Sequence, residues 1–159
     1  MLHQVRIVLV RPEHGGNVGA AARILKNMGL RELVIVAPRF EREEEARFWA
    51  SGAEDLLAAA RRVDSLQEAL ADCRWIVATT RRAGKRRTSD HTPRALAARV
   101  VAQPQRRPLA LLFGPEKAGL TASDLAQSQE LLRIPTSAEH ASLNLAQAVA
   151  IVAWELFMA

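Results

Sequence analysis

The sequence predicts an α/β domain built around a parallel β-sheet, and three observations carry this prediction. Short, mostly apolar runs such as Val5–Val10 and Leu109–Phe113 are typical of strands that are buried on both faces. Segments with helical spacing of apolar residues alternate with these runs along the chain. No repeat, low-complexity tract or linker interrupts the 159 residues, so we expect a single domain over residues 1–159.

The first half of the chain begins with the strand over Val5–Val10, which ends before Pro12. Asn17 is expected to cap a helix that runs to about Met28, where Gly29 closes it. The further elements expected in this half are a strand over Leu33–Ala37, a helix over Glu41–Ala50, a short strand ending at Val63, a helix from Asp64 to Asp72, and a strand over Trp75–Thr79.

The second half opens with the most loop-like stretch of the chain, residues 81–91. Thr92 and Pro93 predict a helix start, with threonine as the cap and proline at the first helical position, and this helix is expected to reach about Gln103. The remaining elements expected are a strand over Leu109–Phe113, a short strand over Leu131–Ile134 and a long helix over Ser142–Met158.

The last helix is apolar on nearly all sides. The positions that leave so little polar surface are Val149, Ala150, Val152, Ala153, Leu156 and Phe157. A helix without a polar face must be buried, and one at the end of a chain is easily buried against a second subunit. The sequence therefore predicts a homodimer formed through this helix, with burial inside its own domain as the alternative.

The charge balance favours a polyanionic partner. The net charge is +5, and only three of the 22 basic residues are lysines. The planar fork of arginine matches phosphate in a bidentate way, although GC-rich codons or a hot habitat would also favour arginine. The chain has no Tyr, four Phe and three Trp, so RNA binding by shape and phosphate contacts is expected rather than base stacking.

Several classes of protein are disfavoured by what the sequence lacks. No apolar run approaches the roughly 18–20 residues that a membrane span needs, so no membrane association is expected. Cys73 is the single cysteine and cannot form an internal disulfide, which favours a cytoplasmic location. The four histidines and Cys73 are not spaced as metal ligands are, so no metal is expected.

Two glycine-rich segments are similar to nucleotide-binding loops but lack their defining spacing. Residues 15–19 follow a strand and open a helix, yet they do not form the Gly-x-Gly-x-x-Gly of dinucleotide-binding folds. Residues 114–121 hold Leu120-Thr121 where a phosphate-binding loop needs Lys-Ser/Thr. No Gly-x-Ser-x-Gly surrounds Ser142 to indicate a hydrolase. Nicotinamide enzymes, nucleotide hydrolases and serine hydrolases are therefore disfavoured.

Taken one at a time, the polar residues of these segments have ordinary structural explanations. Arg23 fits a solvated arginine on a helix, and Glu116 fits a carboxylate in a turn or at a helix start. Ser142 and Asn144 fit the cap and the first turn of the last helix. These separate explanations do not account for the order in which the segments occur.

Three segments together carry the functional signal. They are residues 17–23 (Asn-Val-Gly-Ala-Ala-Ala-Arg), 113–121 (Phe-Gly-Pro-Glu-Lys-Ala-Gly-Leu-Thr) and 142–146 (Ser-Leu-Asn-Leu-Ala). In this order and at these distances they resemble the signature motifs of the SpoU (TrmH-like) class of SPOUT RNA methyltransferases. The resemblance covers nearly the whole chain and is strongest to the TrmJ-like branch, which methylates a ribose at position 32 of the tRNA anticodon loop.

The resemblance implies a SPOUT fold, with a deep trefoil knot over roughly residues 75–159, and S-adenosylmethionine as the cofactor. Carried over from the family's motifs, the cofactor-binding residues would be Thr79, Thr80, Arg81, Gly114, Ile134, Ala141, Ser142 and Leu143. These residues come from three strand ends and the start of the last helix, which fits ligand binding at the carboxyl edge of a parallel sheet. A glycine at position 114 would let the cofactor approach the backbone closely.

The catalytic residues that the resemblance implies are Arg23, Asn17, Glu116, Ser142 and Asn144. SpoU enzymes are homodimers in which the arginine of one subunit approaches the cofactor of the other. The reaction is an in-line attack of a ribose 2′-oxygen on the sulfonium methyl group. Because arginine stays protonated in proteins, Arg23 is expected to clamp phosphate and polarise the hydroxyl, while a neighbouring group or water accepts the proton.

The substrate is expected to be RNA, and most of all tRNA. Arg81 to Arg87 place five positive charges in seven residues after a strand end, so Arg82, Lys85, Arg86 and Arg87 are predicted to bind RNA together with Arg23. TrmJ-like bacterial enzymes usually carry a C-terminal extension that helps hold tRNA, so the chain is expected to be either a compact homologue, in which this basic segment would compensate, or a trimmed catalytic domain. The alternatives are an rRNA 2′-O-methyltransferase, a catalytically silent knotted RNA-binding protein, and an unrelated α/β enzyme that uses a nucleotide.

Overall fold

The computed structural model describes residues 2–81, 90–103 and 108–159. Within them the chain forms one sheet of seven strands in the order β3-β2-β1-β6-β4-β7-β5, and every pair of neighbours is parallel. The strands are β1 (Val5–Val10), β2 (Glu32–Val36), β3 (Arg61–Val63), β4 (Trp75–Thr79), β5 (Asp90–His91), β6 (Leu109–Phe113) and β7 (Glu130–Leu132). The predicted α/β class with a parallel sheet is confirmed.

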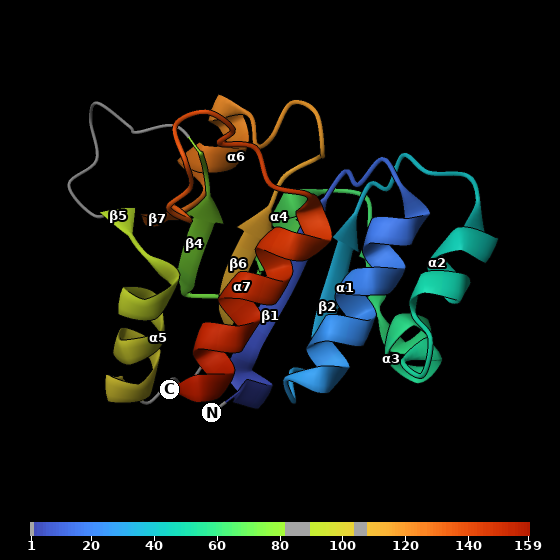
Figure 1. Cartoon of the computed structure of the whole chain (residues 1–159), viewed down its shortest axis with the longest axis horizontal. Coiled ribbons are helices and arrows are strands. Elements are labelled where there is room, and N and C mark those ends of the chain that lie inside the picture. The colour runs from blue at the N-terminus through green and yellow to red at the C-terminus, as the bar shows by residue number, and fades with distance from the viewer. Residues whose placement is uncertain (1, 82–89, 104–107) are drawn as a thin grey trace.

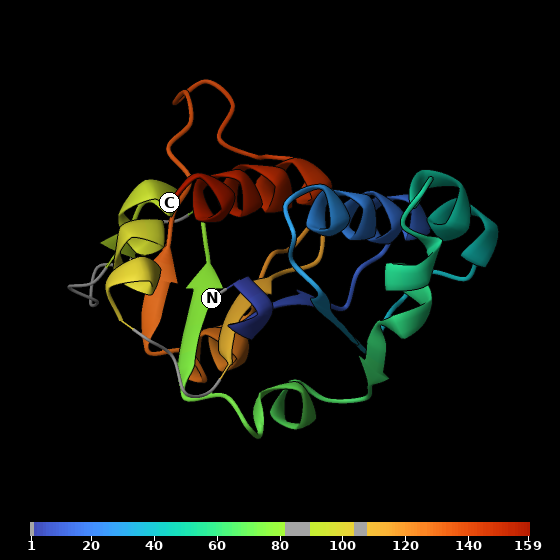
Figure 2. The ribbon, with the colours of Figure 1, turned by 90° about the horizontal axis from the view of Figure 1, so that it is seen from below.

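Helices cover both faces of this sheet (Figures 1 and 2). After a short 3-10 turn η1 (Leu2–Gln4), the helices are α1 (Gly15–Asn27), α2 (Glu43–Trp49), α3 (Glu54–Ala59), α4 (Leu66–Leu70), α5 (Pro93–Ala102), α6 (Ala122–Ala126) and α7 (Leu145–Met158). One face is covered by α1, α5 and α7, and the other by α4 and α6. This two-sided burial explains why the strands are apolar at consecutive positions.

The core divides at the sheet because side chains alternate along each strand. Ile7 and Leu9 of β1 pack toward α1 and α7, whereas Val8 and Val10 pack in the cluster that holds α4 and Leu125 of α6. The strands all run in one direction, so their carboxyl ends meet at the upper edge in Figure 1. In open parallel sheets ligands bind in crevices at this edge.

The predicted element boundaries are nearly right, but four of the predicted helix starts are wrong, among them that of α2, which begins at Glu43 rather than Glu41. Helix α1 begins at Gly15 with His14 at the N-cap, so Asn17 does not cap it. Ser65 rather than Asp64 caps α4, because its hydroxyl accepts the backbone N–H of Glu68. The last helix begins at Leu145, not Ser142, and Asn144 is its cap. Asn17 and Ser142 are thereby released from the structural roles that their positions indicated.

Besides the 3-10 turn η1, three short elements were not predicted from the sequence. Helices α3 and α6 are too brief to show a clear helical period, and β5 has only two residues. Of the three, α6 did carry a local signal, since Thr121 and Asp124 form a reciprocal capping box at its start. The short α6 matters for the site because residues on either side of Asp124 line the cavity described below.

A buried arginine, Arg6, holds the sheet together near the amino ends of its strands. Arg6 is 6% exposed on β1, and its guanidinium donates to both carboxylate oxygens of Asp72, at 2.6 and 3.0 Å, and to Glu32 at 2.9 Å. A further hydrogen bond of 2.9 Å reaches the carbonyl of Ala69 in α4. The hydrogen bonds from Arg6 lower the pKa of Asp72 to about 2. Arg6 thus ties β1, β2 and the end of α4 together, far from the carboxyl edge.

Helix α7 is not buried on all sides. Its inner face packs against α1 and α5, but Ile151, Trp154, Phe157 and Met158 are exposed. Burial within its own domain, the alternative considered above, therefore accounts for only one side of the helix. None of the helices in the described ranges has the length and apolar character that crossing a membrane requires. The trefoil knot stays a prediction.

Candidate functional site

A carboxylate from one predicted motif holds the loop before α1. The side chain of Glu116, which lies just after β6, accepts hydrogen bonds from the backbone N–H groups of Glu13 (2.8 Å) and His14 (2.8 Å). It also accepts one from the side-chain amide of Asn17 at 3.1 Å. A negative charge at this place also interacts favourably with the N-terminal end of α1. Glu116 therefore fixes the position of the first motif.

The same amide side chain connects to the third motif. Asn144 donates a hydrogen bond of 3.0 Å to the side-chain oxygen of Asn17. The oxygen of Asn144 accepts the backbone N–H of Gln147 and so caps α7. One chain of hydrogen bonds thus runs from Glu116 through Asn17 to Asn144. It joins the start of α1, the loop after β6 and the start of α7, which explains why the three motifs occur together.

A cavity of about 330 Å³ opens beside this network at the carboxyl edge of the sheet. Every residue that the family resemblance assigned to the cofactor lines it, namely Thr79, Thr80, Arg81, Gly114, Ile134, Ala141, Ser142 and Leu143. Glu116 lines it as well. Sequence reasoning missed the apolar part of the lining, which comes from Leu120, Leu125, Leu131 and Leu132. The volume falls in the range of about 300–1,000 Å³ that is usual for small-molecule sites.

The polar groups at the end of β4 also hold the strands in place. The hydroxyl of Thr79 donates to the carbonyl of Leu112 at 2.8 Å, and the N–H of Thr80 donates to the carbonyl of Leu132 at 2.9 Å. These two hydrogen bonds join the end of β4 to β6 on one side and to β7 on the other. A ligand in the cavity would meet a rigid wall here, with the oxygen of Thr79 still able to accept a hydrogen bond.

The reason for a glycine at position 114 differs from the expected one. A Cβ atom at Gly114 would lie 2.4 Å from the backbone nitrogen of Leu120 and 2.6 Å from the carbonyl carbon of Gly119. The loop folds back on itself, closed by a hydrogen bond of 2.9 Å from Gly119 N–H to the Pro115 carbonyl, and Gly119 has a φ of +68°. Gly114 is therefore required by the loop's own backbone, whatever lies in the cavity.

The glycine of the first motif serves helix packing. A Cβ atom at Gly19 would lie 2.0 Å from the carbonyl oxygen of Ala46 in α2. Helices α1 and α2 approach so closely that only a hydrogen atom fits at this position. The motif therefore combines one residue that positions a helix, Gly19, with one polar residue, Asn17, that is hydrogen-bonded beside the site.

Of the two predicted catalytic residues Arg23 and Ser142, only Ser142 lies at the cavity. Ser142 is half-buried in the cavity wall. Arg23 is exposed on α1, forms no ion pair with a described residue, and is not part of the cavity wall. Six residues of helix separate it from Asn17, a rise of about 9 Å. The structure therefore brings together Asn17, Glu116, Ser142 and Asn144 but not Arg23.

A second charged pair braces the cavity wall and was not predicted. Arg11 follows β1, has a φ of +48°, and contacts both oxygens of Asp124 at 2.5 and 3.3 Å. Asp124 is 5% exposed. Burial raises the pKa of its carboxyl group, but the hydrogen bonds from Arg11 and Thr121 together lower it by more, so the pKa lies below its ordinary value. The unusual backbone of Arg11 is the structural sign of this role, and the sequence alone does not show it.

Some predicted residues cannot be placed. Arg82, Lys85, Arg86 and Arg87 lie outside the described residues, whereas Arg81 is described and exposed. Across residues 2–81, 90–103 and 108–159, no group of three His, Cys, Asp or Glu side chains is arranged to hold a metal ion.

The sequence matches a family model described as the SpoU rRNA Methylase family over residues 4–154. The chain belongs to the SpoU methylase family. It is 40% identical over 159 residues to the tRNA (cytidine/uridine-2′-O-)-methyltransferase TrmJ of Yersinia pestis (strain Pestoides F). The match covers 100% of the chain but 62% of that relative, so the chain spans under two thirds of its length.

Solved SpoU-family relatives have the same architecture. The fold matches a probable methylase family protein from Haemophilus influenzae Rd KW20 with a TM-score of 0.94 and 40% identity, covering 99% of this chain and 66% of that one. It matches the crystal structure of TrmJ from Z. mobilis ZM4 with a TM-score of 0.89 and 41% identity, covering 97% of this chain and 69% of that one. The predicted family is confirmed.

Proposed function

We propose that the protein transfers a methyl group from S-adenosylmethionine to a ribose 2′-hydroxyl of tRNA, in the anticodon loop at a position of the 32 type. The observation that carries this proposal is the coincidence of the cavity with the motifs. The residues assigned to the cofactor from the family line one cavity, and the hydrogen-bonded chain Glu116–Asn17–Asn144 lies beside it. The high identity to TrmJ proteins supports the reaction and the substrate.

The cavity fits S-adenosylmethionine in size and chemistry. Its leucines offer an apolar surface for an adenine ring, and the Thr79 oxygen, the Ser142 hydroxyl and strand-end backbone groups offer hydrogen bonds. When bound, S-adenosylmethionine supplies an electrophilic methyl group on a sulfonium. The chain's own contribution is a rigid wall that orients this group, because Thr79 and Thr80 are anchored to the neighbouring strands.

The catalytic groups have separate tasks in this proposal. Ser142 and the Asn144–Asn17 pair hold the ribose side of the site, and Glu116 acts as a positioning residue through the loop before α1. Arg23 binds a phosphate next to the target ribose and polarises its hydroxyl. As the bond from the 2′-oxygen to the methyl carbon forms, the sulfur–carbon bond breaks and the hydroxyl proton leaves to a neighbouring group or to water.

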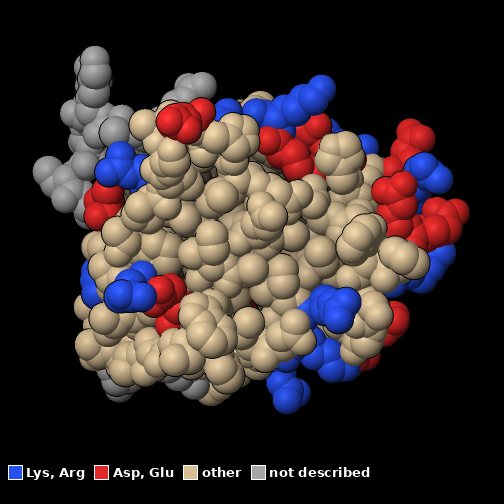
Figure 3. Space-filling view, viewed as in Figure 1, with Lys and Arg blue, Asp and Glu red and all other residues tan. Residues whose placement is uncertain are grey.

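The position of Arg23 supports a homodimer. Arg23 is exposed, lies outside its own cavity wall, and shares a face of α1 with Gly16 and Ala20, at helical spacing. Helix α7 lies beside α1 and also turns exposed residues outward, including Ile151 and Trp154. Figure 3 shows that the centre of this face carries few charges, which lie mainly at its rim. An apolar face of this kind fits a second copy of the chain, which would bring its Arg23 to the cavity.

Two other functions remain as alternatives to be tested. The description of the family model names rRNA, so a ribose of rRNA is the main alternative substrate. A catalytically silent RNA-binding protein would have been free to lose Asn17, Arg23, Glu116, Ser142 and Asn144, all of which are present. A tRNA substrate goes with a cytoplasmic location, which the single cysteine also favours.

The test is methyl transfer from labelled S-adenosylmethionine to unmodified tRNA and to rRNA, with the modified nucleosides identified by mass spectrometry. The proposal predicts a 2′-O-methylated pyrimidine nucleoside in tRNA and its loss in Arg23→Ala. Methylation of rRNA alone would reassign the substrate, and methylation of a base would overturn the reaction. Binding of S-adenosylmethionine without transfer to either RNA would favour the silent binding protein.

A further inference from the structure

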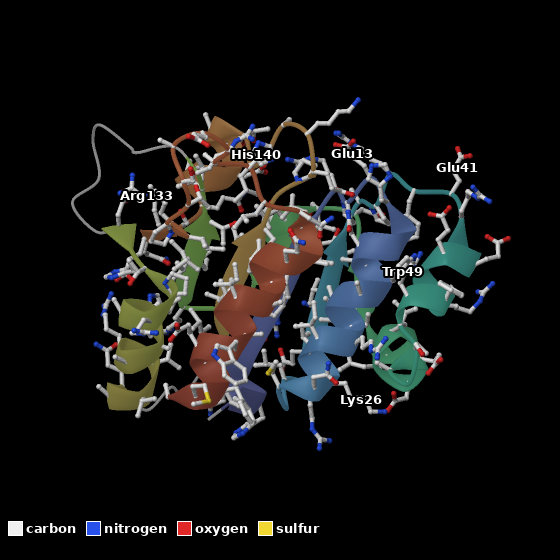
Figure 4. All side chains as sticks on the ribbon, viewed as in Figure 1. Glu13, Lys26, Glu41, Trp49, Arg133 and His140 are labelled. Atoms are coloured by element: carbon white, nitrogen blue, oxygen red, sulfur yellow. The ribbon has the colours of Figure 1, made fainter. Side chains whose placement is uncertain are left out.

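Two exposed cations flank the cavity in the same manner. Lys117 lies in the loop after β6, and Arg133 follows β7. The residues directly before and after each of them line the cavity, while Lys117 and Arg133 themselves are exposed. Figure 4 shows Arg133 beside β5 and β7, with His140 and Glu13 farther along the same upper part of the molecule. Both cations therefore start at the cavity's rim and extend away from its interior.

The backbone that carries these cations is held firmly. The N–H of Arg133 donates to the carbonyl of His91 at 2.9 Å, and the preceding carbonyl, that of Leu132, accepts the N–H of Thr80 at 2.9 Å. Lys117 lies within the loop that the Gly119–Pro115 hydrogen bond closes. The backbone at both positions is therefore fixed beside the opening, and each side chain extends from a fixed point.

These cations have no carboxylate partners among the described residues. Glu130, the acid closest to Arg133 in sequence, instead accepts from Arg99 at 2.7 Å and from Trp75 at 3.2 Å, and His91 lies 3.1 Å from it. Asp90 pairs in register with Leu131 but forms no ion pair with Arg133. Other cations of the fold are neutralised, as Arg6 is by Asp72. The positive charge at the rim is therefore free for a ligand.

We propose that Lys117 and Arg133, together with Arg81 at the end of β4, form a phosphate-binding rim that holds the RNA backbone around the cavity. The proposal rests on the function proposed above and names the residues that hold its substrate. The segments that follow β4, β6 and β7 each contribute one exposed cation. An apolar cavity with a cationic rim fits a nucleic acid whose phosphates stay outside while one ribose reaches inward. Arginine and lysine at such a rim bind phosphate without reading sequence.

The experiment compares binding of an unmodified tRNA transcript by the full chain and by Lys117→Ala, Arg133→Ala and the double variant, over a series of salt concentrations. Arg31→Ala is the matched control, because Arg31 is exposed, forms no ion pair with a described residue, and precedes β2 at the opposite edge of the sheet. Each lost phosphate contact should lower the slope of log K against log salt by about 0.7–0.9. S-adenosylmethionine affinity, measured by calorimetry, should not change in any of these variants.

The proposal is supported if both rim variants flatten the salt dependence and weaken binding several-fold while Arg31→Ala behaves as wild type. It is overturned if the rim variants and Arg31→Ala lose the same small amount, which would indicate a general effect of net charge. If the wild-type chain methylates tRNA but the rim variants bind tRNA normally, the phosphate-binding rim is refuted while the proposed function stands. If the wild-type chain binds no RNA, the proposed function fails with it.

Discussion

The side-chain amide of Asn144 donates a 3.0 Å hydrogen bond to the side-chain oxygen of Asn17, across 127 positions of sequence. This bond joins the start of α7 to the start of α1, and Asn17 in turn donates to Glu116 after β6. Three motifs that look unrelated in the sequence therefore form one structural unit beside the cavity. A residue of this unit can be important for activity without touching either substrate.

The two tasks of Asn144 can be separated by substitution. Asn144→Ser keeps an oxygen that can cap α7 but cannot reach Asn17, whereas Asn144→Ala loses both. We expect Asn144→Ser to lower the free energy of unfolding by less than about 1 kcal/mol, and Asn144→Ala by about 1–2 kcal/mol. Both should lower the rate of methyl transfer by about tenfold or more, because the ribose side of the site is misplaced. Urea unfolding and initial rates would check this, and a normal rate for Asn144→Ser would contradict it.

The close contact between α1 and α2 predicts a large packing effect at Gly19. In Gly19→Ala the new methyl group would overlap the Ala46 carbonyl, so the helices must separate. We expect a loss of about 1–3 kcal/mol in the free energy of unfolding, which corresponds to a fall in Tm of a few degrees or more. Gly16→Ala is the matched control, since the new methyl would meet only the exposed ring of Trp49, which can move. Equal Tm values for the two variants would refute this account of the motif.

The Arg6–Asp72 pair predicts a pH dependence of stability. In the folded state, the hydrogen bonds from Arg6 lower the pKa of Asp72 to about 2, from its ordinary value of 3.8. A lowered pKa stabilises the fold above the unfolded value and loses this effect as the pH falls. The stability difference between wild type and Asp72→Asn should therefore be largest above about pH 4 and shrink toward pH 2. Urea unfolding at several pH values measures it, and a difference that does not vary between pH 5 and pH 2 would show that the pair contributes no such effect.

The proposed dimer predicts a specific effect of charge on α7. Trp154 is 49% exposed and its ring lies 6.2 Å from that of Phe157, so it belongs to the apolar outward face of the helix. A glutamate at this position would be buried without a partner in a dimer but solvated in a monomer. Trp154→Glu should therefore be a folded monomer by light scattering and circular dichroism. Phe48→Glu, on the exposed side of α2, should leave the mass of the assembly unchanged. A dimeric Trp154→Glu would remove α7 from the interface.

The sequence was sufficient for the longer strands, because these carry strong local signals, and the family motifs supplied the polar part of the cavity wall. Val5–Val10 and Leu109–Phe113 are strands in the structure as predicted, since apolar runs of this length bury well on both faces. Thr92 caps α5 as its position before Pro93 indicated. The residues at the strand ends could be carried over from the family because the carboxyl edge of a parallel sheet brings them together.

The sequence was insufficient where a residue's role depends on a distant partner. Asn17 and Ser142 are both residue types that commonly cap helices. Asn17 is instead hydrogen-bonded to Glu116 and Asn144, and α7 begins only at Leu145, after Ser142. The Arg11–Asp124 pair also joins residues far apart in the chain, and no local pattern marks it. Long-range hydrogen bonds leave no period in a sequence, so only the folded structure reveals them.

The measurement that tests the account most directly uses a heterodimer purified with two different tags. One subunit carries Arg23→Ala with an intact cavity, and the other carries Ser142→Trp, which fills its cavity, with Arg23 intact. Each variant alone should be inactive in tRNA methylation. The heterodimer should recover about half of wild-type activity, because one of its two sites combines an intact cavity with the partner's arginine. An inactive heterodimer, assembled and able to bind S-adenosylmethionine, would contradict a methyl-transfer site completed by two subunits.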